Sequence, residues 1–134
     1  MKWFRKAAEQ GDADAQNRLG RCYAEGDGVD QNYQEALKWL RKASANGSSD
    51  AQVYIGYMYE NGYGVPKSYT EALKWYRMAA KEGHATAQYN IGVFYQNGWG
   101  VAKNRSEAIN WYRKAAQGGY YDAQRKLNDW GEPS

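Results

Sequence analysis

The sequence predicts an all-α fold, an α-solenoid of antiparallel helix pairs, and two recurring features with a common period predict it. Ala-Gln pairs and Gly-x-Gly-Val turns return in phase, each at the same place in a unit of 36 residues. A fixed period between roughly 20 and 50 residues is typical of stacked repeats, in which each copy buries its apolar faces against its neighbours. Four tryptophans mark the period, namely Trp3, Trp39, Trp75 and Trp111.

The frame of these copies defines one repeat domain over residues 1–134. Because Trp3 aligns with Trp39, the chain begins in the middle of a copy. Either the natural protein begins abruptly there, or the chain is a fragment of a longer array. The parts of the domain are a partial second helix at 1–11, full copies at 12–47, 48–83 and 84–119, and a degenerate C-terminal helix at 120–134.

The first helix of each copy is expected over residues 13–25 and the equivalent ranges. Ala15 and Leu19 fall on one side of a helix that turns about 100° per residue. Gly20 lies on the same side and costs roughly 1 kcal/mol against alanine in mid-helix. Its recurrence therefore predicts the close approach of a neighbouring helix. Gly26 is expected to end the helix in a left-handed conformation.

A second helix is expected to follow each Gly-x-Gly-Val turn. Asn32 and Glu35 have the spacing of a capping box, in which the first side chain accepts a hydrogen bond from the backbone N–H three residues on. The same spacing returns in the later copies, and a glycine is expected to close each second helix. The recurring pairs are Ser68 with Glu71 and Asn104 with Glu107, and the closing glycines are Gly47, Gly83 and Gly119.

Composition limits the class of protein. The chain has 134 residues, near the size of one ordinary domain, and its net charge of +3 is too small to indicate nucleic-acid binding. A single cysteine allows no disulfide within the chain. No apolar run is long enough to cross a membrane, so membrane insertion is not expected. Localisation stays open, cytoplasmic as the chain stands and periplasmic or secreted if a signal was removed.

The stretch from Asp50 to Lys67, with the stretch from Glu71 to Arg77, resembles the Sel-one-like repeat (SLR) family, a branch of the tetratricopeptide superfamily. The resemblance implies a right-handed solenoid of TPR-like helix pairs. It also implies a scaffold for partner proteins or peptides, in roles that include the bacterial envelope and host contact. Asn128 replaces the family glycine in the last helix, which is therefore expected to be degenerate.

The resemblance further implies that the first helices line a concave surface. An apolar centre of tyrosine and valine with a polar rim is typical of interaction surfaces. The asparagine amides are expected to hold the backbone of an extended peptide, and the flanking arginines to favour an acidic ligand. The residues expected to bind a partner are Asn17, Arg21, Val53, Tyr57, Glu60, Asn61, Tyr89, Val93, Gln96, Asn97 and Arg125.

We therefore expect a protein- or peptide-binding scaffold or adaptor without enzymatic activity. Two interpretations of the tyrosines stay open, a ligand groove centred on Tyr57 and Tyr89 or structural packing across helices. The alternative function is a small-ligand or cell-wall-fragment binder with at most weak β-lactam hydrolase activity, as the resemblance implies for some family members.

Other conspicuous residues favour structural roles. His84 stands at a helix start where sister copies have Asp12 and Ser48, so we expect it to cap the helix. Cys22 is expected to fill the core, because it occupies the position of Met58 in the next copy. No catalytic residue, metal site or cofactor is expected, since no nucleophile has a base at suitable spacing and no cluster has metal-ligand spacing.

Two surface features complete the sequence predictions. A ladder of arginines on the second helices is expected to be a solvated face and not a nucleic-acid site. The exposed edge near Phe4 and the last helix near Trp130 are candidates for end-to-end self-association. The ladder consists of Arg5, Arg41, Arg77 and Arg113.

Overall fold

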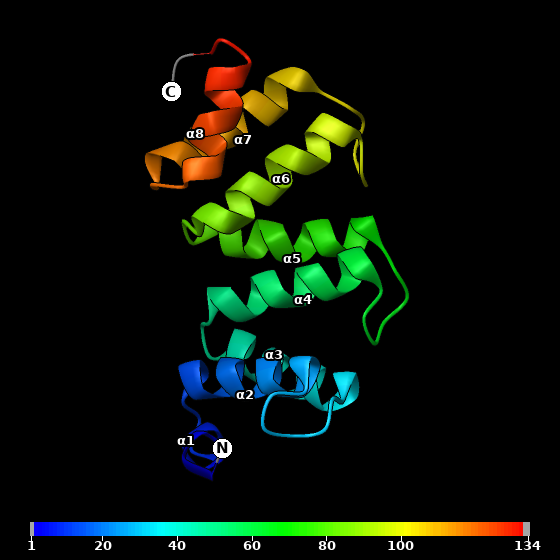
Figure 1. Ribbon diagram of the computed structural model, residues 1–134, viewed down its shortest axis with the longest axis vertical. Coiled ribbons are helices and arrows are strands. Elements are labelled where there is room, and N and C mark those ends of the chain that lie inside the picture. Colours follow the sequence, from blue (N-terminus) through cyan, green and yellow to red (C-terminus); the bar gives the residue numbers. More distant parts are fainter. Residues whose placement is uncertain (1, 133–134) are drawn as a thin grey trace. The chain divides into compact units, whose positions relative to one another are not determined.

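The computed structural model describes residues 2–132, and all regular structure in that range is helical, as the sequence predicts (Figure 1). The chain groups into two compact units, Met1–Lys67 and Ser68–Ser134. The first unit contains α1 (Lys2–Glu9), α2 (Ala13–Glu25), α3 (Tyr33–Ala45) and α4 (Ser49–Asn61). The second contains α5 (Tyr69–Lys81), α6 (Ala85–Asn97), α7 (Arg105–Gln117) and α8 (Tyr121–Asp129).

Side-chain caps fix the start of the second helix of each copy. The side-chain oxygens of Asn32, Ser68 and Asn104 each accept a hydrogen bond, 3.1 Å long, from the backbone N–H three residues on. This bond satisfies one of the backbone donors that every helix start leaves without an intrahelical partner. The predicted cap positions are therefore confirmed.

The first helices begin with a different set of caps. Asp12 and Ser48 accept hydrogen bonds from the backbone N–H groups three residues later, at 3.0 and 3.1 Å. His84 caps α6 in the same way, because its Nδ1 accepts from the backbone N–H of Ala87 at 3.4 Å. The prediction that His84 is a helix cap is confirmed.

Glycines end the first helices and let the second helices approach them. Gly26 has φ 70°, and its N–H donates to the carbonyl of Cys22. A Cβ added to Gly20 would lie 2.7 Å from Leu40 Cγ, and one added to Gly92 would lie 2.6 Å from the Tyr112 ring. Both distances are too short for any side chain, so the predicted close approach is confirmed at these two positions.

Each unit buries its own apolar cluster. Ala8, Ala15, Leu19 and Trp39 pack together in the first unit. Full burial of a large apolar side chain such as Leu19 contributes about 1.5–3 kcal/mol. The cluster of the second unit comprises Ala108, Tyr112, Ala115, Ala123 and Leu127.

The loop that follows a first helix packs on the start of the preceding second helix. In the first unit, Tyr63 stacks on Tyr33 with ring centroids 5.5 Å apart, and Gln34 donates to the Gly64 carbonyl. In the second unit, Trp99 stacks on Tyr69 with centroids 5.0 Å apart. The loops are therefore held by aromatic contacts to the preceding copy.

None of the helices within residues 2–132 combines the length and apolarity that a bilayer crossing requires. The predicted single repeat domain and its copy boundaries stay predictions, since contacts group the chain into the two units given above.

Candidate functional site

Four tyrosines of the first unit lie against one another and are named here the tyrosine cluster. Its members are Tyr33, Tyr54, Tyr57 and Tyr63. Tyr57 makes edge contacts with Tyr54 and Tyr63, each with ring centroids 5.7 Å apart. Tyr57 is 43% exposed and Tyr63 is 37% exposed. The cluster is therefore a connected aromatic surface that solvent still reaches.

Two hydroxyls of the cluster, those of Tyr54 and Tyr57, are held in their neutral form. Desolvation raises the pKa of Tyr54 above its ordinary range, and the carboxylate of Glu25 adds to the effect by accepting from the Tyr54 hydroxyl at 3.1 Å. Desolvation also raises the pKa of Tyr57, with the neighbouring Tyr63 as the next cause. Both side chains therefore present hydrogen-bonding hydroxyls, and not phenolates, at neutral pH.

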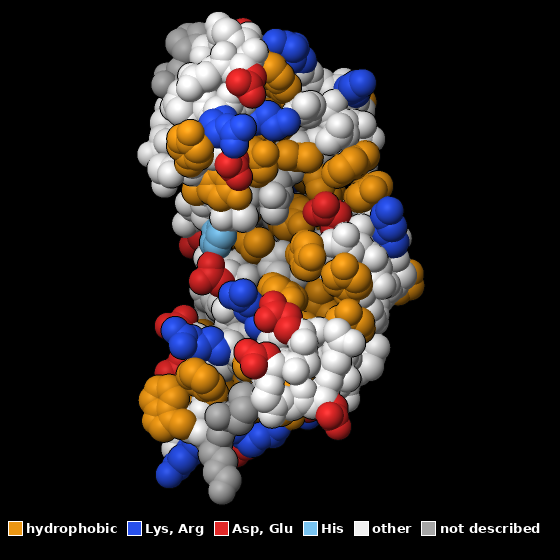
Figure 2. All heavy atoms as spheres, in the orientation of Figure 1, with side chains coloured by type: hydrophobic (Ala, Val, Ile, Leu, Met, Phe, Trp, Pro, Cys, Tyr) orange, Lys and Arg blue, Asp and Glu red, His pale blue; other side chains and the backbone are white. Residues whose placement is uncertain are grey.

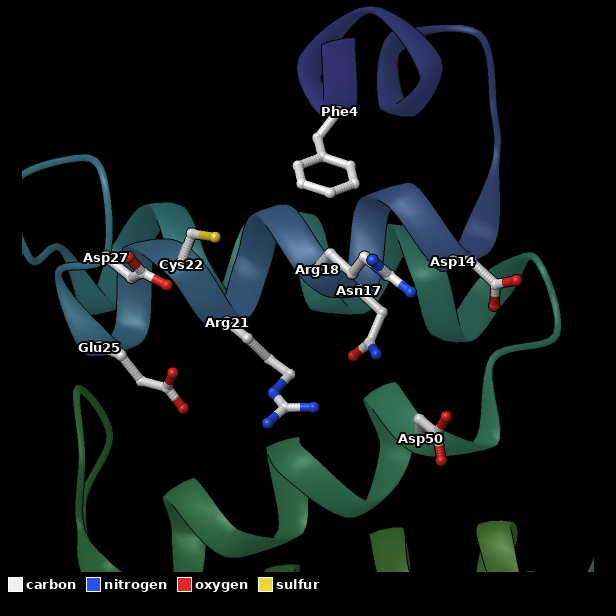
Figure 3. A pocket seen from close by; sticks show the side chains of 9 residues that line it. All are labelled: Phe4, Asp14, Asn17, Arg18, Arg21, Cys22, Glu25, Asp27 and Asp50. Atoms are coloured by element: carbon white, nitrogen blue, oxygen red, sulfur yellow. The ribbon is translucent and has the colours of Figure 1, made fainter. Parts of the chain in front are cut away.

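A cavity of about 570 Å³ adjoins the cluster in the first unit (Figure 3). Asn17 and Arg21 point from α2 toward α4, whereas Phe4 approaches α2 from α1. The Arg21 guanidinium lies over the Tyr54 ring, 5.4 Å from its centroid, which joins the cavity to the tyrosine cluster. The remaining lining residues are Asp14, Arg18, Cys22, Glu25, Asp27 and Asp50.

Two predictions about this cavity are wrong in part. Asn17 was expected on the exposed partner-binding surface, but it is only 7% exposed, and its Oδ1 has no hydrogen-bond partner among the described residues. Packing around α2 covers it while leaving the amide directed into the cavity. Cys22 was expected in the core, but it is half-buried and lines the cavity. Burial raises the pKa of the Cys22 thiol, with Asp27 and Glu25 as further causes.

Tyr89 and Val93 pack largely within the second unit. Both lie against the buried cluster around Tyr112. Tyr89 stacks on Tyr120 with ring centroids 4.9 Å apart, and desolvation raises its pKa. Tyr89 also lines a cavity of about 350 Å³ with Arg125, so the structure brings these two predicted residues together. At Tyr89 the packing interpretation describes most of the contacts.

Two asparagine amides that were expected to hold a peptide backbone, and the amide of the predicted partner-binding residue Gln96, are partly occupied. Asn61 Nδ2 donates to the Tyr57 carbonyl at 2.9 Å, and Asn97 Nδ2 donates to the Val93 carbonyl at 3.0 Å. Gln96 is half-buried, and its Oε1 accepts from the buried Tyr112 hydroxyl at 2.5 Å. Each amide therefore keeps only part of its hydrogen-bonding capacity for a ligand.

The other predicted residues divide between the units. Val53 and Glu60 are half-buried on α4, whereas Arg21 and Arg125 are exposed. Because Val53 lies in the first unit with Tyr57, and Tyr89 lies in the second with Val93, a single groove over both units stays a prediction.

Sequence reasoning missed Tyr54 and Tyr63, which complete the exposed aromatic surface. Tyr63 stands inside a Gly-x-Gly turn that was treated only as a helix stop. The presence of an aromatic residue between two glycines could have identified Tyr63 from the sequence. Tyr54 gives no comparable signal, because its neighbour Arg21 is on another helix.

The arginine ladder has internal partners. Arg5 donates to the Tyr23 hydroxyl, and Arg41 donates to the Tyr59 hydroxyl at 3.4 Å. Arg113 instead forms a salt bridge with Glu132 at 3.1 Å. On the face that Figure 2 shows, Lys and Arg side chains lie among Asp and Glu side chains. The ladder thus connects helices and is not only the solvated face that we expected.

Comparison with known proteins agrees with this architecture. The family model for the Sel1 repeat matches residues 1–12, 13–48, 49–84 and 85–120. No protein in a search of curated sequences matches the chain.

Three solved structures are similar to the chain. A Sel1 repeat protein from Oxalobacter formigenes is 45% identical with a TM-score of 0.84, over 95% of this chain and 96% of that one. A protective antigen present in uropathogenic Escherichia coli strains, displaying an SLR fold, is 41% identical with a TM-score of 0.88, over 95% of this chain and 27% of that one. Helicobacter pylori cysteine rich protein B is 27% identical with a TM-score of 0.73, over 94% and 90%. The α-solenoid fold of SLR proteins is thereby confirmed, and the chain belongs to the Sel1 repeat family.

Proposed function

We propose that this chain is a scaffold that binds an extended segment of a protein partner through the first-helix surface of its copies. The observation that carries the proposal is the tyrosine cluster of the first unit, in which two rings are more than a third exposed. Tyrosine supplies a large contact area at a low cost in side-chain entropy, and it is enriched where interfaces bind most strongly.

The neighbouring cavity supplies polar groups that an extended segment can use. Asn17 lines this cavity from α2, and its Oδ1 is buried without a hydrogen-bond partner among the described residues. One turn later on α2, the Arg21 guanidinium is held over the Tyr54 ring and presents its N–H groups. A segment lying along the cluster would therefore find an aromatic surface beside the Arg21 cation.

The absence of enzymatic activity is also part of the proposal. A nucleophilic cysteine is activated by a lowered pKa, whereas burial and nearby carboxylates raise the pKa of Cys22. The imidazole of His84 is engaged as a helix cap in the second unit. These two residues therefore do not form an activated pair of nucleophile and base.

The proposal is tested with peptides selected from a displayed random library on the purified chain. We expect a selected peptide to bind the Tyr57→Ala/Tyr63→Ala variant at least about tenfold more weakly, as loss of two interface tyrosines implies. Tyr121→Ala is the matched control, because that ring is 72% exposed in the second unit. Fluorescence anisotropy measures both affinities.

Two outcomes would contradict the proposal. One is equal binding of the selected peptides by the double variant and by the control. The other is a thermal-shift screen in which cell-wall muropeptides or β-lactams stabilise the chain and peptides do not. That result would favour the small-ligand alternative.

A further inference from the structure

A further cavity, of about 580 Å³, lies in the second unit and is lined by other residues than the one that Tyr89 and Arg125 line. It is lined by Gln96 and Asn97 at the end of α6, Lys103 in the following loop, Arg105 at the start of α7, and Trp130 after α8. Two of these five side chains are cationic and none is acidic. The cavity therefore has a formal charge of +2.

The polar groups of this cavity are arranged as donors. The Arg105 guanidinium lies 4.4 Å from the centroid of the Trp130 ring, and stacking on a ring face leaves the N–H edge of a guanidinium available. Gln96 uses its Oε1 to accept from Tyr112, so the amide has its Nε2 donors left for a ligand. Lys103 is exposed and adds an ammonium group.

The equivalent positions in the preceding copies are electrically neutral. Counting back 36 residues, the positions of Gln96, Lys103 and Arg105 are held by Glu60, Lys67 and Tyr69. The second copy thus provides its own carboxylate at these positions, and the third replaces that carboxylate with an amide. The first copy is also neutral there, with Ala24, Gln31 and Tyr33.

We propose that this cavity binds the carboxylate of an Asp or Glu side chain in a partner peptide. A planar carboxylate accepts two parallel hydrogen bonds from a guanidinium edge, and the amide and the ammonium can donate to its remaining lone pairs. In the second copy Glu60 supplies a carboxylate at the position of Gln96, and we infer that a ligand supplies the equivalent carboxylate to the third copy. The inference rests on the proposed function in taking the carboxylate from a peptide, but it concerns a different surface.

The test uses two short peptides that are blocked at both ends and differ only in Glu or Gln at two central positions. Each is titrated into the 15N-labelled chain while the Arg105 Nε–H and Trp130 Nε1–H resonances are followed. We expect the Glu peptide to shift both resonances to saturation and the Gln peptide not to. Higher salt should weaken the response, because the charges are exposed and are screened.

The decisive variant is Gln96→Glu, which copies the residue of the second copy. The new carboxylate still accepts from Tyr112, so the fold should be retained, but it lowers the formal charge of the cavity from +2 to +1. We expect the Glu peptide to bind at least about fivefold more weakly. Gln117→Glu is the matched control, because this exposed residue at the end of α7 takes the same charge change outside the cavity.

The inference and the proposed function fail separately. Tyr57→Ala changes the tyrosine cluster of the first unit and should leave the response of Arg105 and Trp130 to the Glu peptide intact. The inference is overturned if the Glu and Gln peptides act alike, or if Gln96→Glu binds as well as Gln117→Glu. Tighter binding of a phosphoserine peptide at these resonances would also overturn it, by assigning the cavity to phosphate.

Discussion

Arg77 donates a hydrogen bond from its Nη2 to the hydroxyl of Tyr95 across 3.0 Å, and this bond joins α5 to α6. Arg5 and Tyr23 make the same contact in the first unit, with the same separation of 18 residues along the chain. A repeated basic position thereby meets a repeated tyrosine half a copy away. The arginine ladder is part of the packing between consecutive helices.

Removing the Tyr95 hydroxyl should lower the free energy of unfolding by a small but measurable amount. We expect Tyr95→Phe to lower the free energy of unfolding by no more than about 0.5–1 kcal/mol, because the bond is exposed to solvent. Urea denaturation measures the change, and a double-mutant cycle with Arg77→Met isolates the pair. Additive effects of the two substitutions would show that the contact contributes nothing to stability.

Replacing Gln16, a buried residue of α2, should lower the free energy of unfolding more than Tyr95→Phe does. Gln16 donates from Nε2 to the Ala8 carbonyl and accepts from Asn46 Nδ2, both at 3.0 Å. Gln16→Ala removes both bonds from a buried site, so the free energy of unfolding should fall by about 1–2 kcal/mol. Gln88 makes a longer bond of 3.4 Å to the Ala80 carbonyl and is half-buried. Gln88→Ala should therefore lower the free energy of unfolding less than Gln16→Ala does. A larger loss for Gln88→Ala in urea denaturation would contradict this prediction.

Adding one methyl group at Gly92 should be destabilising. Its Cβ would lie 2.6 Å from the Tyr112 ring, which is fully buried and cannot move freely. Alanine gains roughly 1 kcal/mol in helix propensity, but overpacking a core of this kind costs about 1–3 kcal/mol. We expect thermal denaturation to show a net loss for Gly92→Ala. Asn110→Ala on the exposed face of α7 is the control, and it should be neutral or slightly stabilising.

The Cys22 thiol should ionise only above the pH at which an ordinary thiol does. Burial raises its pKa, so at a given pH the folded chain holds less of the reactive thiolate than the unfolded chain. The midpoint of the alkylation rate against pH should therefore lie higher for the folded protein than in concentrated urea. Stability from this group is full below the unfolded pKa of about 8.5 and is lost as pH rises through the folded value.

Cys22→Ala tests whether the raised pKa of the thiol makes the stability of the fold depend on pH. Its free energy of unfolding should depend less on pH above about 8.5 than that of the parent chain. Identical alkylation midpoints for the folded and unfolded protein would show that the cavity does not desolvate the thiol.

Local signals made the helices predictable from the sequence. Caps such as Asn32 and left-handed glycines such as Gly26 act within a few residues of the helix ends that they determine. Gly20 was informative for the same reason, since its recurrence can be explained only by a close neighbour. Each of these features belongs to a single copy and repeats with it.

The candidate site was less predictable, because its properties depend on contacts between helices. Exposure of Asn17 was inferred from an ideal helix alone, whereas the packing around α2 decides its burial. The bond between Gln96 and Tyr112 depends on which residue faces α6 from α7. The pairing of Arg77 with Tyr95 was accessible in principle, because both residues recur in phase with a constant separation.

The stacking of loop aromatics on an earlier helix start has a consequence for how such a chain can vary in length. Tyr63 meets Tyr33, and Gly64 leaves no room for a Cβ, which would lie 2.4 Å from the Cβ of Tyr33. A single residue inserted into or deleted from that loop would move the Tyr63 ring off the Tyr33 ring and break this stacking. The equivalent contact is not made in every copy, because Asp27 stands at the Tyr63 position in the first copy and Arg105 stands at the Tyr33 position in the third. The length of the loop is therefore constrained where both rings are present, as at Tyr63 and Tyr33.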